Sequence, residues 1–424
     1  MLIQVDGALT PEPMPHPLFI PIFGLLLHVH HPLIATPALQ ASGAGQAETE
    51  APEAGLVRFG SRWVMPEDLY RYERGFVPTE SGTWQRASAV AALEEGLTRV
   101  DLDYLNAEEL KQSKQGLYKC GKLWLDLPDA NDYHSRLLRW WRIPNERFVA
   151  YSTCDRAVAE EALGWMSFAH GDLVRLFGTA PKLPITVIVL RSLVQYSAFS
   201  VEPTGDQAFP PETRGFSAFH HAYLCDQWLD SEFDNDFPGA ACAYWDNSTE
   251  AGRAWGPFAV RHAAAQAFVE ALDPSPDAVR SFTKDPSLGL PGTEFWVEKD
   301  LPAWLRYGAA SYCERFFVDR QAEDPLWART WSLGELSGQG GLGDLEAAFR
   351  CELDPKEVGR SAKLMLEAGA IVAFILDGQV PAVAERHREL QAAIKKGQNI
   401  SAAVAALEAA VLESEQQLRI FSEN

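Results

Sequence analysis

The stretch from residue 147 to residue 190 limits the possible folds more than any other part of the chain. RFVAYST (147–153) is rich in strand-forming residues, and LPITVIVL (183–190) is β-branched and apolar throughout, as in a strand buried on both faces. Between them, apolar residues recur every three or four positions from 156 to 177, as on one face of a helix. The sequence therefore predicts a strand–helix–strand unit with its helix packed on a sheet, and ACAYWD (241–246) supplies a further strand.

The second half of the chain is predicted to be mainly helical. PFAVRHAAAQAFVEAL (257–272) is Ala-rich with one apolar side, and LPAWLRYGAASYCERFF (301–317) has a proline at its start, a favoured first-turn residue. Three more helices are predicted at about 355–377, 381–396 and 401–421. Their Ala-rich faces indicate close helix packing.

Length and charge exclude several classes of function. A chain of 424 residues is long enough for about two or three domains. Its 58 acidic and 37 basic residues give a net charge of −21. We therefore expect no nucleic acid partner and no strong binding to an anionic membrane, because both surfaces would repel the chain.

Six cysteines lie far apart and include no CxxC pair, which excludes a zinc ribbon or a thioredoxin-type motif. An even number in a long chain does not establish disulfides, and we favour buried free thiols over three bridges.

The histidines outside the two central helices offer no clear metal site. His221 and Cys225 are four residues apart and His220 is adjacent, but two ligands without a third do not make a site, so we expect no metal there. We expect His170 to lie on the surface or to be half-buried, and His387, within the charged run ERHRE, to face solvent.

Residues 17–39 form the only long apolar run, PLFIPIFGLLLHVHHPLIATPAL. Four prolines and three histidines make it a poor membrane-spanning helix. Small residues up to Ala47 follow it, as after a secretory signal, but no Lys or Arg precedes it. Export, a retained anchor and a disordered or wrongly assigned start all remain open.

Three short segments that combine glycine with tryptophan resemble one another: GSRWVMPEDL from Gly60, SGTWQRASAV from Ser81 and GKLWLDLPDA from Gly121. They predict small hairpin units joined to short helices, with Trp63, Trp84 and Trp124 as packing anchors. The thirteen tryptophans of the chain suit either a large aromatic core or stacking against carbohydrate, and composition does not separate the two.

The helices at 257–272 and 301–317 together resemble those of the gluzincin metallopeptidases. In that family the zinc helix carries HExxH and the next helix carries P-x-W-L-x-E-G-x-A-x-Y. His262 matches the first histidine, whereas Ala263, Gln266 and Tyr307 stand where the family has its general base, its second histidine and its third zinc ligand. The rest of the second pattern matches at Pro302, Trp304, Leu305, Gly308, Ala310 and Tyr312.

The resemblance covers about 150–424, and more loosely 57–150, because similar glycine–tryptophan modules precede this domain in some bacterial members. The resemblance implies the family's fold, but the residues that the family's reaction needs are missing from this sequence. A catalytic zinc needs three protein ligands and an open position for water, and a base must accept the proton of that water. Here one imidazole remains, a neutral amide replaces the second, and alanine replaces the base. His262 and Gln266 would share one helix face, where we expect them to satisfy each other's hydrogen bonds in the core.

Together these observations predict an α+β fold with a small mixed sheet, a helical zincin-like domain and C-terminal helices, preceded by small tryptophan-containing β/α modules. The expected divisions are an apolar N-terminus (1–47), the Gly–Trp repeat region (48–145), the sheet-containing part (146–255) and the helical part (256–424).

The predicted function is that of a catalytically inactive metallopeptidase homologue, exported or cytoplasmic, that needs no cofactor or metal and binds a protein or peptide or serves as a structural module. The remnant of its active-site cleft would be His262, Ala263, Gln266, Trp304 and Tyr307. The alternative is an active hydrolase with a non-standard site in which His262 pairs with a carboxylate such as Glu270 or Glu314, or which uses the His220, His221 and Cys225 group.

Overall fold

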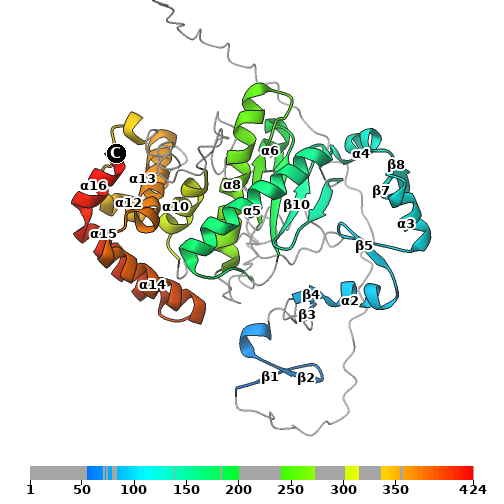
Figure 1. Cartoon of the computed structure of the whole chain (residues 1–424), viewed down its shortest axis with the longest axis horizontal. Helices are drawn as coiled ribbons and strands as arrows, with labels where there is room; N and C mark the ends of the chain where they lie inside the picture. The colour runs from blue at the N-terminus through cyan, green and yellow to red at the C-terminus, as the bar shows by residue number, and fades with distance from the viewer. Residues whose placement is uncertain are drawn as a thin grey trace, which may run out of the picture. The chain divides into compact units, whose positions relative to one another are not determined.

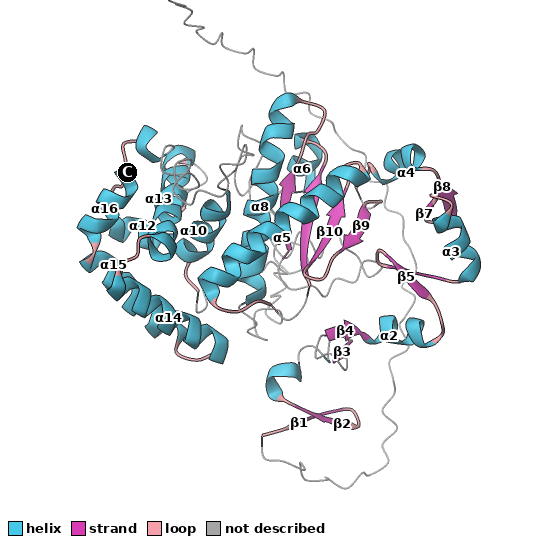
Figure 2. Cartoon of the chain, in the orientation of Figure 1, coloured by secondary structure: helices cyan, strands magenta, loops and turns pink. Residues whose placement is uncertain are grey.

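A computed structural model describes residues 55–69, 72, 75–78, 84–137, 139–181, 184–199, 240–272, 301–314, 336–353 and 357–423. The chain divides into two units, 1–52 and 53–424, and all described residues belong to the second. The apolar run at 17–39 and the His220, His221 and Cys225 group lie outside the described residues. The structure is mixed α/β, with small sheets and many helices (Figure 2).

The amino-terminal part of the second unit repeats one motif four times: an antiparallel two-stranded hairpin followed by a short helix (Figure 1). We number these modules in chain order. They are β1 (Val57–Phe59), β2 (Arg62–Val64) and η1 (Pro66–Asp68); β3 (Phe76–Pro78), β4 (Trp84–Arg86) and α2 (Ala87–Glu94); β5 (Thr98–Val100), β6 (Asp103–Leu105) and α3 (Ala107–Lys114); β7 (Tyr118–Cys120), β8 (Leu123–Leu125) and α4 (Leu127–His134).

Local sequence explains where the modules begin and end. Gly96 and Gly116 directly follow the C-cap residues of α2 and α3. Their φ angles are 83° and 82°, a conformation that favours glycine. Asn106 starts α3 with a capping box. Its side chain accepts a hydrogen bond from the backbone N–H of Glu109, and the Glu109 carboxylate accepts one from the backbone N–H of Asn106. The third module was not recognised in the sequence because Tyr104 stands where the first and fourth modules have tryptophan.

The larger sheet has four strands in the order β12–β11–β10–β9. Strands β10 (Phe148–Ser152), β11 (Ile185–Leu190) and β12 (Ala240–Tyr244) are parallel, and β9 (Trp141–Pro144) is an antiparallel edge. This confirms the three predicted strands and adds β9, which lies inside the region predicted to hold only repeats. Its terminal proline is tolerated because it ends an edge strand.

Helix α5 (Arg156–Phe177) connects β10 to β11 and packs on the sheet, as the strand–helix–strand pattern predicted. It ends at Gly178, whose φ is 71°. A short helix, α6 (Leu193–Phe199), follows β11 and was not predicted.

The remaining described helices form the carboxyl-terminal part. They are α8 (Glu250–Leu272), α10 (Ala303–Glu314), α12 (Leu345–Arg350), α13 (Val358–Asp377), α14 (Pro381–Lys396), α15 (Ile400–Glu413) and α16 (Glu415–Glu423). Helix α8 starts earlier than predicted and continues through Pro257, and the single helix predicted at 401–421 is divided near Ser414.

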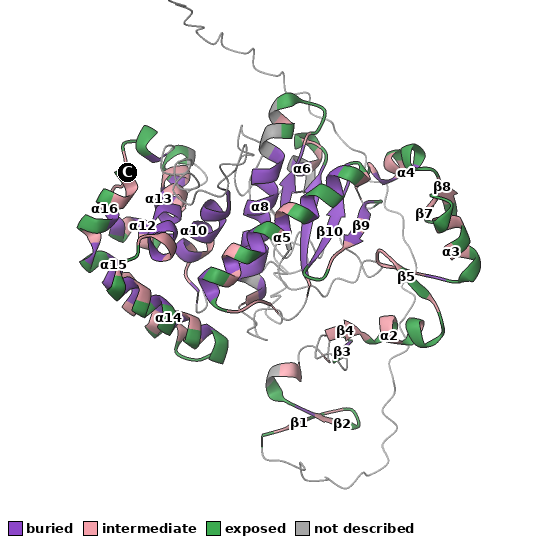
Figure 3. Ribbon diagram, in the orientation of Figure 1, coloured by how far each residue is buried: buried purple, intermediate pink, exposed green. Residues whose placement is uncertain are grey.

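Helix α8 joins the sheet to the helical part. It packs on β11, β12 and α5, and it also contacts α10, which in turn packs on α13. Figure 3 shows α8, α10 and β10 buried over most of their length, whereas α14 has buried and exposed faces. The main core is therefore continuous from the sheet through α8 and α10 to α13.

Two histidines are more buried than predicted. His170 is 7% exposed, with its ring edge-on to Phe148 and Phe268, and burial lowers its pKa to about 4. His387 is 8% exposed and its Nε2 donates to the carbonyl of Leu176, 2.6 Å away, near the end of α5. The expectations of a half-buried or surface His170 and a solvated His387 are wrong. For His387, the charged residues next to it in the sequence lie on the faces of α14 that point away from α5.

The five described cysteines are buried and form no disulfide, as expected, and Cys225 lies outside the described residues. Burial raises the pKa of Cys120 to about 11 and that of Cys154 to about 12, so these two thiols stay protonated and unreactive at neutral pH.

In the described part of the chain, no single helix is both long and apolar enough to cross a membrane. Only the pair α13 and α14 reaches that length and composition together, and the two helices are bent by 98° at the break between them.

Close contact between α10 and α13 depends on Gly308. A Cβ at this position would lie 2.6 Å from the carbonyl oxygen of Ala368 and 2.8 Å from Val372 Cγ2. We predict that Gly308→Ala lowers the free energy of unfolding by about 1–3 kcal/mol, because the backbones must separate.

Urea denaturation measures this change, and Gly359→Ala is the matched control. A Cβ on Gly359, also helical, meets nothing within 4 Å, so this variant should be neutral or more stable by up to about 1 kcal/mol. Equal stability of the two variants would show that α10 and α13 are not in close contact in solution.

Candidate functional site

The predicted site residues lie on α8 and α10, which pack against each other. His262 and Gln266 are one turn apart on α8, and the Gln266 amide nitrogen lies 3.1 Å from His262 Nε2. On its other side, His262 Nδ1 bonds to the Glu314 carboxylate from α10. The structure thus brings together Gln266, His262 and Glu314 in one hydrogen-bonded cluster, which we call the His262 cluster.

The hydrogen bonds assign the protons in this cluster. The Gln266 amide donates, so His262 Nε2 accepts and carries no hydrogen. The hydrogen of the neutral ring is then on Nδ1, which donates to Glu314. Each ring nitrogen therefore has a partner within the chain, and the expected mutual satisfaction of His262 and Gln266 is observed.

The His262 cluster is closed to solvent. His262 is 2% exposed, and Gln266 and Glu314 are each 3% exposed. The three residues between His262 and Gln266 are alanines, and Ala263, Ala264 and Ala265 are fully buried. A charged or polar cluster at this depth stabilises the fold only if its hydrogen bonds are complete, and here the ring nitrogens meet that condition.

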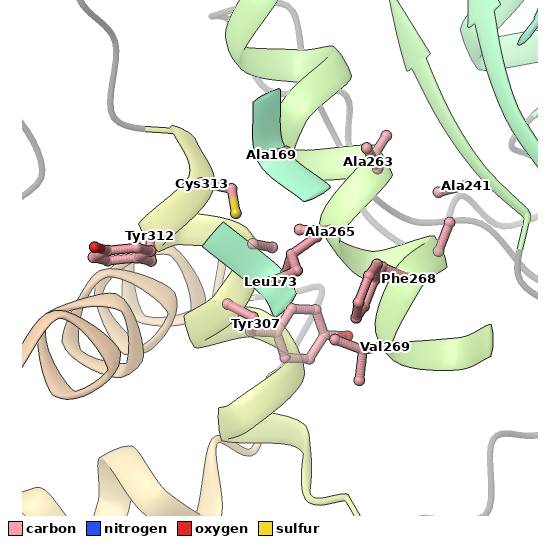
Figure 4. Close-up of a cluster of buried hydrophobic side chains, with 14 of the residues drawn as sticks. Ala169, Leu173, Ala241, Ala263, Ala265, Phe268, Val269, Tyr307, Tyr312 and Cys313 are labelled. Atoms are coloured by element: carbon pink, nitrogen blue, oxygen red, sulfur yellow. The ribbon is translucent and has the colours of Figure 1, made fainter. Parts of the chain in front are cut away.

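Ala263 and Tyr307, two more residues of the predicted remnant, lie in packed surroundings on α8 and α10. Figure 4 shows Ala263 on the side of α8 that faces Ala241 of the sheet, and the Tyr307 ring lying against Val269. The guanidinium of Arg306 lies 4.8 Å from the Tyr307 ring centre, and its Nη2 is 3.4 Å from the hydroxyl. Tyr307 is 7% exposed, so these positions belong to a packed interface rather than to an open cleft.

Trp304, the last residue of the predicted remnant, has a packing role. It is fully buried, its Nε1 donates to Glu408 of α15 over 2.6 Å, and its ring is edge-on to Phe349. Burial raises the pKa of Glu408, an effect that this hydrogen bond opposes. Trp304 therefore ties α10 to α12 and α15.

Tyr312, the last matched residue of the second-helix pattern, also joins elements. Its hydroxyl donates to Asp377 over 2.9 Å, and Arg175 of α5 bonds to both Tyr312 and Asp377. The pattern from Trp304 to Tyr312 thus describes how α10 packs against its neighbours.

Sequence reasoning missed one polar residue of this region. Arg261 is fully buried, its guanidinium lies 4.5 Å from the Phe168 ring centre, and one of its nitrogens is 3.8 Å from Asp172. An arginine beside a histidine looks like a surface position in a sequence. The absence of acidic residues between 257 and 269 was the available sign that this stretch of helix is buried.

The His262 cluster does not fit a zinc ion. It offers one imidazole and one carboxylate that already bond each other, and the remaining member is a neutral amide. Across the described ranges, no three His, Cys, Asp or Glu side chains are placed to hold a metal. The arrangement can orient a ring and hold a proton between Nδ1 and a carboxylate, but it presents no ligand set to a metal-bound water.

Comparison of the chain with protein-family models, with curated proteins and with solved structures gives no match.

The His262–Glu314 contact gives a direct stability prediction. Glu314→Leu should lower the free energy of unfolding by about 2–3 kcal/mol, because the buried Nδ1–H loses its acceptor. In the double variant His262→Leu/Glu314→Leu the loss should be smaller than the sum of the single losses by at least about 1 kcal/mol.

Equilibrium denaturation of the two single variants and the double variant supplies this cycle. Glu346→Leu is the matched control, since that carboxylate is 75% exposed on α12 and should change stability by less than about 0.5 kcal/mol. Additive losses from His262 and Glu314 would contradict the observed contact.

Proposed function

We propose that this chain is a catalytically inactive relative of the gluzincin metallopeptidases, with a zincin-like arrangement of its sheet and of α8 and α10. The observation that supports the proposal is the His262 cluster, where an imidazole at the position of the first zinc ligand is held on both sides by protein groups. The pattern on α10 and the sheet before α8 agree with the resemblance.

In this proposal, the loss of peptidase activity follows from the residues at the matching positions. Ala263 offers no group to accept a proton from water, and Gln266 is a poor ligand for Zn²⁺. A tyrosine such as Tyr307 coordinates readily only when ionised, and an ordinary phenol has a pKa of about 10. Three separate requirements of the family's reaction fail together.

In this proposal the chain serves as a protein-binding, peptide-binding or structural module. The remnant residues are buried, so a partner would be held by other surfaces of the protein. The net charge of −21 supports a partner other than nucleic acid or an anionic membrane. The apolar run before the small residues near Ala47 supports export to an envelope or extracellular location.

Restoring the missing ligands tests the assigned positions. Ala263→Glu, Gln266→His and Tyr307→Glu together should create zinc uptake, measured by calorimetric titration, because the three ligand positions would then be filled. The unmodified chain should take up no zinc and should cleave unfolded casein no faster with zinc than with a chelator.

The double variant Ala263→Glu/Tyr307→Glu is the matched control, since it adds the same charge but lacks the second histidine and should bind zinc far more weakly. Metal-dependent proteolysis by the unmodified chain would overturn the proposal. If the folded triple variant took up no zinc, the assigned positions would be wrong.

One observation favours a second candidate function, an active hydrolase with a non-standard site. His262 bonded to Glu314 is an imidazole oriented by a carboxylate, as in many hydrolases. Glu270, the other carboxylate considered, has a side chain outside the described part of the structure. Burial of the pair and the bond from Gln266 to Nε2 count against catalysis, because the ring presents no free nitrogen to a substrate.

Ester hydrolysis separates this candidate from the first. If the second candidate were correct, turnover of p-nitrophenyl acetate would be lost in both His262→Ala and Glu314→Gln. We expect the same rate for the unmodified chain and for both variants. Loss of turnover in both folded variants would establish the hydrolase.

A further inference from the structure

A cavity lies away from the His262 cluster, between the third and fourth hairpin–helix modules and the beginning of the sheet. Its volume is about 520 Å³, within the range of about 300–1,000 Å³ that small-molecule sites usually have. Its walls come from β5, β6, α3, β7, β8, α4, β9 and the start of α5.

The modules are fixed to the sheet around this cavity. Arg156 of α5 bonds both oxygens of Asp101, at 2.7 and 3.1 Å, and its guanidinium also lies 5.1 Å from the ring centres of Tyr118 and Trp141. Arg142 of β9 bonds Asp103 at 2.8 Å. The cavity is therefore framed by half-buried ion pairs and aromatic contacts that span the modules and the sheet.

The cavity wall carries hydrogen-bond groups that the described chain leaves unused. The indole of Trp124 and the hydroxyl of Tyr133 make no hydrogen bond to any described residue, and both side chains are half-buried. Trp141 is 4% exposed, and its buried Nε1 has no hydrogen-bond partner within the described ranges. The exposed Arg139 lies 5.0 Å from the Tyr133 ring centre and forms no ion pair with a described acid.

These unused groups are nearly all donors. Two indole N–H groups and one guanidinium can only donate, and the phenol can donate or accept. The two carboxylates in the wall, Asp101 and Asp103, are already bonded to Arg156 and Arg142. A ligand that fits must supply acceptor oxygens to Trp124 and Arg139, the half-buried and exposed donors that a ligand can reach.

The charge of the cavity wall also favours a ligand that carries acceptor oxygens. The chain as a whole is strongly acidic, yet the cavity is lined by four basic and only two acidic side chains: Lys119, Arg139, Arg142 and Arg156 against Asp101 and Asp103. Lys119 is bonded to Glu109 at 2.7 Å, so Arg139 is the lining cation without an acidic partner in the described structure. A guanidinium matches a carboxylate in shape as well as in charge.

We propose that this cavity binds an acidic carbohydrate, a sugar that bears a carboxylate. The pyranose ring would stack on the half-buried aromatic side chains of Trp124 and Tyr133, and the carboxylate would bond Arg139. Sugar hydroxyls both donate and accept, so they can satisfy the indole and phenol groups. A peptide fits less well, because each backbone N–H can only donate, whereas every sugar hydroxyl can accept from the donors of the wall.

The hairpins support this assignment independently. Opposite the aromatic residue of the second strand, three modules carry a basic residue: the cross-strand pairs are Arg58 with Trp63, Arg99 with Tyr104 and Lys119 with Trp124. The sequence therefore repeats a cation beside an aromatic ring. The pair Lys119 and Trp124 is the one that lines the cavity with both members.

Calorimetric titration of the full chain with tetragalacturonic acid tests the proposal. We expect saturable binding of one tetramer per chain, which weakens as salt is raised. A neutral galactose tetramer of the same length and a tetraglutamate peptide should each bind at least about tenfold more weakly, because each lacks either the carboxylate or the ring.

Two pairs of variants locate the site. Trp124→Ala and Arg139→Gln should each weaken tetragalacturonate binding by about tenfold or more, since each removes one main contact. Trp63→Ala, at the equivalent position of the first module, and Arg136→Gln, an exposed arginine outside the cavity, should change it by less than about twofold. Circular dichroism checks that all four variants are folded.

Three results would overturn the assignment. The first is no saturable binding of the acidic tetramer. The second is binding that is equal for the neutral tetramer or tighter for the peptide. The third is equal affinity in the folded cavity variants and their controls. Because no zinc or peptidase readout enters this test, its outcome is independent of the proposed loss of metallopeptidase activity.

Discussion

The structure depends on the burial of α8 on all sides. Every residue from Gly256 to Val269 is buried, and this stretch contacts α5, two strands of the sheet and α10. Only small side chains let a helix approach so many neighbours closely, which explains the run of alanines from Ala263 to Ala265. Any polar group in this stretch must find its partner inside the protein.

That constraint explains the His262 cluster. A lone imidazole at the centre of a fully buried helix would lose its hydrogen bonds to water, and Gln266 and Glu314 replace them. An open catalytic centre makes the opposite demand, since it must leave one position for water or substrate. The same residues cannot meet both demands at once, and with both ring nitrogens bonded the His262 cluster contributes to the stability of the fold.

Much of the fold could be predicted because its signals are local. The β-branched run that forms β11 and the regular apolar spacing of α5 identify buried elements without tertiary information. The burial of His387 and Arg261 could not be predicted in this way, because it depends on which face of each helix meets α5. The third module was missed because tyrosine replaces the marker residue, although the spacing of Gly75, Gly96 and Gly116 already contained the repeat.

The candidate site, like the fold, could be predicted from the sequence only in part. The spacing of His262 and Gln266 predicted their contact, and Glu314 was one of two carboxylates considered for the ring. The cavity between the modules and the sheet could not be foreseen, because its walls come from segments as distant as Val100 and Arg156. The repeated tryptophans were assigned to packing, and only the structure shows that Trp124 lines a cavity.

The amount of metal bound to the purified chain tests the central claim most directly. The protein should be prepared without chelators and without a histidine tag, and its zinc content measured by elemental analysis. The account predicts a value near zero, because the residues around His262 are bonded to one another. About one zinc per chain would contradict it and would show that the chain holds a metal site of another composition.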